Sequence, residues 1–152
     1  MSLIHADPAI SARAEDLLKR SQVLHLALAN QDQPYLVPLS FGYADGCLYF
    51  HSGPHGRKLE MLAINPQVCF EVEEGIGVVP ADLACNFNMR FLSLIGFGKA
   101  IRLTTSAEKR AGLDVIVRQY GGEPPDYDEK RVTALEVVKI EIQSINLREV
   151  NP

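Results

Sequence analysis

The sequence lacks tryptophan, closely spaced cysteine pairs, runs of basic residues and long hydrophobic segments. Its three cysteines, Cys47, Cys69 and Cys85, form an odd and scattered set. That pattern argues against a disulfide framework and favours reduced thiols in the cytoplasm. The formal net charge is −4, and the sequence has no basic stretch of the kind that nucleic-acid binding needs. No apolar run reaches the length of a membrane span and residues 1–10 do not form a signal peptide, so we expect a cytoplasmic protein that binds neither nucleic acid nor membrane.

What remains is the composition of an ordinary globular protein. The chain has 152 residues, of which 47% are hydrophobic and 22% are charged. This length and composition predict a single domain over residues 1–152, large enough to bury a full core. The spacing of His25, His51, His55 and the cysteines is not that of zinc ligands, which predicts no metal site.

Hydrophobic periodicity predicts a mainly β fold. The expected strands are residues 23–29, 35–43, 47–51, 68–73, 89–103 and 135–147. Helices are expected after Asp7, after Gly56 and after Thr105, and residues 74–88 have no predicted regular structure. Six strands, mostly joined by hairpins, with three packed helices predict a small antiparallel β-barrel.

The predicted strand 89–103 is apolar on both faces. Leu94 and Gly96 fall on one face, and Phe91, Ile95 and Phe97 fall on the other. A single barrel interior cannot bury both faces, and an exposed apolar stripe usually marks an interface. The sequence therefore predicts a homodimer.

Polar chemistry is concentrated at residues 48–66, where a strand ends at His51 and Ser52 and a short helix follows. Arg57 and Lys58 fall in the first helical turn, where the helix dipole disfavours cations by up to about 1 kcal/mol. An anion between these cations and the free backbone N–H groups would reverse that effect. A phosphate suits the position, and Ser52 could donate to it. A solvated basic turn is the alternative, and charge alone favours that alternative.

Several segments, in this order and spacing, resemble the pyridoxamine 5′-phosphate oxidase-like flavin proteins. The more similar branch includes the nitroimidazole-resistance proteins. The segments are VPLSF (37–41), YFHS (49–52), GRK (56–58), NPQVCF (65–70) and SLIGFGKA (93–100). The resemblance covers residues 17–147. It implies a split β-barrel of the FMN-binding type, usually a homodimer with flavin sites at the subunit interface.

The resemblance also implies which residues bind FMN. They are Val37, Pro38, Leu39, Ser40, His51, Ser52, Arg57, Lys58 and Ser93. The backbone of 36–40 would meet the edge of the flavin ring, where Pro38 lacks a donor. His51 and Ser52 would lie along the ribityl chain and phosphate, and Arg57 and Lys58 would clamp the phosphate. For Ser93, a hydroxyl that merely lies on an interface strand is an equal alternative.

The implied activity is that of an FMN-dependent oxidoreductase acting on a small organic substrate, with a nitroimidazole reductase as one version. No catalytic residue can be assigned, because no nucleophile–base pair is visible and the chemistry would be the flavin's own. Three alternatives remain: a flavin-binding or sensing protein without turnover, a haem-binding relative with His51 or His25 as axial ligand, and a deazaflavin protein. Vitamin B6 oxidation is not expected, because the oxidases proper carry a C-terminal segment with tryptophan and arginine. This sequence has no tryptophan and ends at Pro152.

Overall fold

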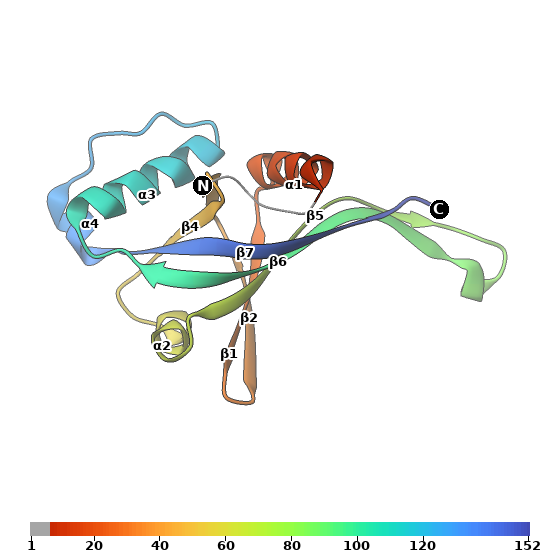
Figure 1. The fold of residues 1–152 in the computed structure, drawn as a ribbon, viewed down its shortest axis with the longest axis horizontal. Helices are drawn as coiled ribbons and strands as arrows, with labels where there is room; N and C mark the ends of the chain where they lie inside the picture. The colour runs from red at the N-terminus through yellow and green to blue at the C-terminus, as the bar shows by residue number, and fades with distance from the viewer. Residues whose placement is uncertain (1–6) are drawn as a thin grey trace.

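The computed structural model describes residues 7–152, and its centre is one antiparallel sheet (Figure 1). The strands are β1 (Leu24–Asn30), β2 (Gln33–Leu39), β3 (Gly42–Ala44), β4 (Cys47–Ser52), β5 (Gln67–Val79), β6 (Asn88–Arg102) and β7 (Glu136–Val150). Their order in the sheet is β2-β1-β5-β6-β7-β4-β3. The helices are α1 (Pro8–Arg20), α2 (Arg57–Ile64), α3 (Ser106–Gln119) and α4 (Glu129–Ala134), with a 3₁₀ turn at Ala84–Asn86.

The mainly β prediction is confirmed, but the predicted strand 35–43 is two strands. β2 pairs with β1 at one end of the sheet, and β3 pairs with β4 at the other end. At the switch, the N–H of Phe41 donates to Tyr120 Oη at 3.0 Å and the N–H of Tyr43 donates to Gln119 Oε1 at 3.1 Å. Because side chains at the end of α3 bond these donors, the chain can leave one ladder and enter another. The sheet therefore has seven strands where the sequence predicted six.

Regular structure also extends into residues 74–88, for which none was predicted. β5 continues to Val79 and β6 begins at Asn88, with a register shift between Glu74 and Gly77. The glycines that suggested a break are thus accommodated by an irregularity within a long hairpin. Figure 1 shows this hairpin reaching away from the body of the protein, alongside the end of β7.

The main core lies on the inner face of the sheet, beneath α1 and α2. Alternate residues of the central strands point into it: Leu24, Leu26, Val68, Phe70, Val72 and Leu94. Phe70 packs directly on Gly96 of the neighbouring strand, where an added Cβ would lie 2.1 Å from the ring. Such a contact leaves no room for a side chain at position 96, which explains a glycine within a central strand.

A smaller core lies under α3 and α4, and α4 was not predicted. This smaller core consists of Leu113, Ile116, Val132 and Val137. The buried Lys109 donates from Nζ to the carbonyl oxygens of Thr133 (3.4 Å) and Leu135 (2.7 Å), at the end of α4. Carbonyls at a helix end need such partners. A helix of six residues is too short to be stable alone, so it relies on its packing against α3, which includes this contact.

Candidate functional site

The first turn of α2 is basic and has no side-chain cap. The helix begins at Arg57, and Gly56 stands at the cap position with a φ of 141°. Since glycine has no side chain, it offers no acceptor to the N–H groups that an α-helix leaves free at its start. Glu60 offsets part of the charge of Arg57 and Lys58. The net result is a helix start with a positive dipole end, free donors and an excess of cationic side chains, which favours an anion.

The two cations contact aromatic rings on two different strands. The guanidinium carbon of Arg57 lies 4.9 Å from the centre of the Tyr35 ring on β2, and Lys58 Nζ lies 5.5 Å from the centre of the Phe50 ring on β4. Burial lowers the pKa of the half-buried Lys58 amine. The basic turn therefore lies between the β2 edge of the sheet and the strand next to its other edge.

β2 has a free edge beside this turn. It stands at one end of the sheet order, so one side of its backbone lacks a partner strand among residues 7–152. Pro34 and Pro38 stand four residues apart, which places their missing N–H groups on the same side of the strand. Proline is tolerated where no ladder bond is required, so this is the free side. Leu36, midway between them and 64% exposed, directs its N–H and C=O to the same side.

The other predicted flavin residues of β2 and β4 occupy different environments. Val37 and Leu39 are half-buried and pack against the main core, whereas Ser40 is exposed. His51 and Ser52 end β4 just before the basic turn, with His51 exposed and Ser52 half-buried. The structure thus brings β2, the end of β4 and the start of α2 together. The side chains of Val37 and Leu39 face the core, and their backbone N–H and C=O groups, which alternate with those of Leu36, point toward β1.

Ser93 is not brought to this cluster within one protomer. It lies on β6, which is separated from β2 by β1 and β5. At about 4.8 Å between neighbouring strands, that is roughly 14 Å across the sheet. Its side chain lines a separate pocket of about 230 Å³ on the outer face, with Glu71, Glu73, Met89 and others.

The structure also reveals a polar cluster that sequence reasoning missed. His25 of β1 lies opposite Glu71 of β5, with Nδ1 3.1 Å from Glu71 Oε2. Burial raises the pKa of Glu71 to about 7, the neighbouring Glu73 adds to the rise, and His25 opposes it. Alternation within residues 68–73 does place Glu71 on the outer face. The pairing with β1, however, is a long-range contact that no local pattern reveals.

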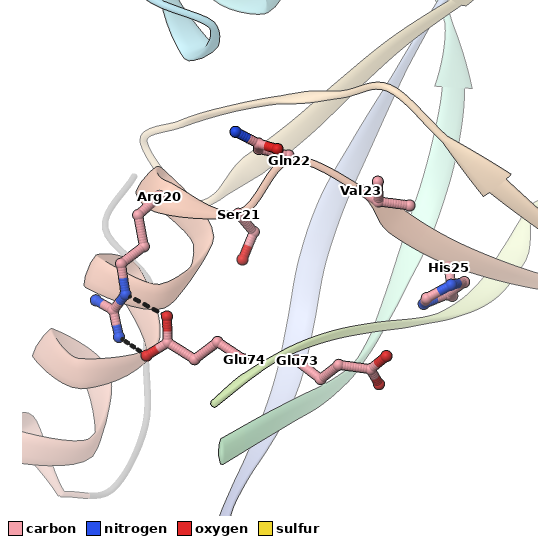
Figure 2. A pocket seen from close by; sticks show the side chains of 7 residues that line it. All are labelled: Arg20, Ser21, Gln22, Val23, His25, Glu73 and Glu74. Atoms are coloured by element: carbon pink, nitrogen blue, oxygen red, sulfur yellow. Dashed lines mark hydrogen bonds and ion pairs between the residues drawn. The ribbon is translucent and has the colours of Figure 1, made fainter. Parts of the chain in front are cut away.

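One side of this cluster opens into a pocket of about 280 Å³ at the end of α1 (Figure 2). Figure 2 shows His25 and Glu73 on one side of the pocket and the ion pair between Arg20 and Glu74 on the other. Arg20 Nε donates to Glu74 Oε2 at 2.7 Å. This bond lowers the pKa of the Glu74 carboxyl, and the guanidinium is thereby already paired.

The antiparallel sheet, whose β2 edge is linked to β4 by the contacts of a short basic helix, defines a split β-barrel. Residues 11–149 match the family model described as pyridoxamine 5′-phosphate oxidase, and the chain belongs to this family.

Solved structures share this fold across nearly the whole chain. A protein from Bacteroides thetaiotaomicron assigned to 5-nitroimidazole antibiotic resistance is 30% identical, with a TM-score of 0.79 over 94% of this chain and 84% of that chain. The FAD and haem binding protein from Mycobacterium smegmatis is 22% identical, with a TM-score of 0.83 over 93% of this chain and 71% of that chain. The flavocytochrome Anf3 from Azotobacter vinelandii is 21% identical, with a TM-score of 0.81 over 97% and 69%. The last two likenesses establish the fold alone.

A curated relative matches over a shorter stretch. An uncharacterized protein of Rhizobium meliloti (strain 1021) is 30% identical over 60 residues, which are 40% of this chain and 39% of that protein. The aligned part therefore spans well under half of that relative.

Proposed function

We propose that this protein binds FMN and acts as a flavin-dependent oxidoreductase on a small organic substrate. The observation that carries the proposal is the uncapped, basic start of α2 beside the free edge of β2. The first feature suits a phosphate, and the second suits the hydrogen-bonding edge of a planar ring. Membership of the pyridoxamine 5′-phosphate oxidase family supports the same ligand.

In this proposal, each group has a defined role toward FMN. Arg57, Lys58 and the first-turn N–H groups hold the phosphate, and Ser52 donates one more hydrogen bond. The backbone of 36–40 faces the ring edge, with the N–H of Leu36 as a donor and with none at Pro38. FMN, when bound, supplies the electron-transfer chemistry. His51 positions ligand at the strand end and does not transfer protons.

We also propose a homodimer formed through the outer face of the sheet. Ile95 is 44% exposed and Phe97 is 54% exposed, and both lie on the same face of β6 as Ser93. Apolar side chains at this exposure, side by side on one face, favour an interface. Ser93 would then meet a flavin only across that interface, because it is distant from the basic turn of its own chain.

For the substrate, we propose a nitro-substituted heteroaromatic compound. The support is the 30% identity to the protein assigned to 5-nitroimidazole resistance. We place the protein in the cytoplasm, in keeping with the free thiols of Cys47, Cys69 and Cys85. Within residues 7–152, the longest helix is neither long nor apolar enough to cross a bilayer.

The decisive experiment is an absorption spectrum of the protein after incubation with FMN and removal of free flavin. Retained flavin bands are the expected result. Anaerobic reduction by NADH or NADPH, followed by reoxidation with a 5-nitroimidazole, should then show turnover. A protein that retains no FMN refutes the proposal, and a haem band in the purified protein favours the haem-binding alternative. Flavin that is bound but not reoxidised by any acceptor identifies a flavin carrier instead of an enzyme.

A further inference from the structure

The outer face of the sheet carries a set of side chains with the donor atoms of a metal site. His25 comes from β1, and Glu71 and Glu73 come from β5. One ligand atom from each of the three side chains lies within 4.8 Å of the other two. The antiparallel pairing of β1 with β5 fixes this arrangement, since it sets His25 directly opposite Glu71. The site is therefore built on strands of the sheet and not on loops.

This set carries negative charge without a compensating cation. Among the ion pairs within residues 7–152, none joins a lysine or arginine to Glu71 or Glu73. The nearest basic group lining the pocket is Arg20, which is occupied by Glu74. Carboxylates held this close to each other repel when both are charged, since their ligand atoms lie within 4.8 Å of one another. A bound cation would relieve this repulsion.

In the single chain, the set also has open space on both sides. His25 and Glu73 line the pocket of about 280 Å³, and Glu71 and Glu73 line the pocket of about 230 Å³ that includes Ser93. A cation held by three protein ligands would therefore have room for water or a small ligand at its remaining positions. That is the arrangement of an accessible metal site, in contrast to a closed structural site.

The donor types select the class of metal. One imidazole nitrogen with two carboxylate oxygens suits Zn²⁺ and its neighbours Mn²⁺, Fe²⁺ and Co²⁺. Ca²⁺ and Mg²⁺ prefer oxygen ligands alone. We propose that His25, Glu71 and Glu73 bind one divalent transition-metal ion on the outer face of the sheet. This inference does not depend on flavin binding.

The experiment uses the whole protein after chelator treatment and removal of the chelator. Co²⁺ is added as a spectroscopic probe, and Zn²⁺ binding is measured by calorimetry. We expect one site per chain, with a visible Co²⁺ spectrum that Zn²⁺ abolishes. His25→Gln and Glu73→Gln should each weaken Zn²⁺ binding by more than about tenfold, since even the loss of groups that support a ligand costs this much.

A matched control lies next to the site on the same strand. Glu74→Gln removes the same charge from a carboxylate that is paired with Arg20, and it should leave metal affinity unchanged. In parallel, Arg57→Ala/Lys58→Ala should lose FMN affinity and keep metal affinity, so that failure of the metal site and failure of the flavin site are distinguishable.

Two results would overturn the inference. One is a dissociation constant for Zn²⁺ above about 1 mM in the wild type, which is too weak for a specific site. The other is equal binding by the wild type, His25→Gln and Glu73→Gln. A readout independent of variant folding is line broadening by Mn²⁺ in the wild-type NMR spectrum. The amide signals of 25 and 71–73 should broaden first, and uniform broadening would refute the site.

Discussion

Arg57 and Lys58, called the phosphate clamp here, can be tested by comparing FMN with riboflavin, which differs from FMN only in lacking the phosphate. The double substitution Arg57→Ala/Lys58→Ala removes both cations from the first turn of α2 but leaves its backbone N–H groups in place. FMN affinity should fall strongly, whereas riboflavin affinity should change little, because riboflavin has no phosphate to hold. Flavin fluorescence titration measures both constants on the same samples.

The expected size of the loss follows from the contacts of the two side chains. A hydrogen bond to a charged group contributes about 1.5–3 kcal/mol, so two such bonds contribute roughly 3–6 kcal/mol. Both cations already contact aromatic rings in the free protein, at 4.9 Å and 5.5 Å. Such contacts are worth about 0.5–1 kcal/mol each and are partly exchanged on binding. The lower end of the range therefore applies, which corresponds to roughly a 100-fold loss of FMN affinity.

A charge-matched control separates the clamp from the overall charge. Arg118→Ala/Lys130→Ala removes the same formal charge from exposed positions in α3 and α4. It should alter FMN affinity by less than about threefold at physiological salt, because exposed charges beyond the Debye length are screened. Equal losses for FMN and riboflavin in the α2 variant would refute the reasoning and show that the phosphate lies elsewhere.

Three further predictions concern the same site and the outer face. Burial lowers the pKa of Lys58 in the free protein, and a bound phosphate would raise that pKa because it favours the charged amine. FMN affinity should therefore be greatest below the pKa of Lys58 in the free protein, and it should fall as the pH rises through that pKa. Lys58→Arg should remove this dependence in fluorescence titrations, and a persisting alkaline decline would contradict the assignment. Light scattering should give a dimer mass for the wild type and a monomer mass for Ile95→Lys/Phe97→Lys. The control is Ile64→Lys, which replaces an exposed side chain of α2 and should stay dimeric. A monomeric wild type with flavin bound would exclude the interface. His51→Ala should modestly lower flavin affinity or turnover without changing the fold, and His51→Gln should restore much of the loss. If both His51 variants were equally impaired and the pH–rate profile lost a limb, the residue would be a general acid or base.

Local signals in the sequence predicted the starts of three helices. α1 follows Asp7, whose side chain accepts from the N–H of Ala9, and α3 follows the capping box of Thr105 and Glu108. α2 starts at Arg57, directly after Gly56, where the sequence predicted a helix start. These starts are encoded within a few residues, so they can be predicted without knowledge of the fold.

Three features that the sequence did not predict depend on distant partners. The switch between β2 and β3 relies on α3 side chains that bond Phe41 and Tyr43, and α4 relies on Lys109 from α3. His25 and Glu71 are 46 residues apart and meet only because β1 pairs with β5. Local periodicity carries no information about such pairings.

For the candidate flavin site, the structure gathers most of the predicted residues but does not test their role. The basic turn contacts both β2 and β4, as a shared ligand site would require. Val37 and Leu39 turn their side chains to the core and their backbone groups to β1, so Leu36 and Pro38 form the free edge. Ser93 lies on another part of the sheet, and its assignment depends on the proposed dimer. The FMN-binding residues therefore remain predictions from the resemblance.

The placement of the basic turn has a consequence for how ligand could enter and leave. β2 and β3 end the sheet order, so the wall of the barrel has a seam that no backbone ladder closes within residues 7–152. Arg57 and Lys58 cross part of this seam through their ring contacts, while Leu59, Met61 and Leu62 of the same helix are buried in the main core. The two ring contacts can separate without breaking a hydrogen bond of the seven-stranded ladder. A phosphate bound there would connect the basic turn to a ligand on the β2 edge, and its release would leave that edge open while the core stays folded.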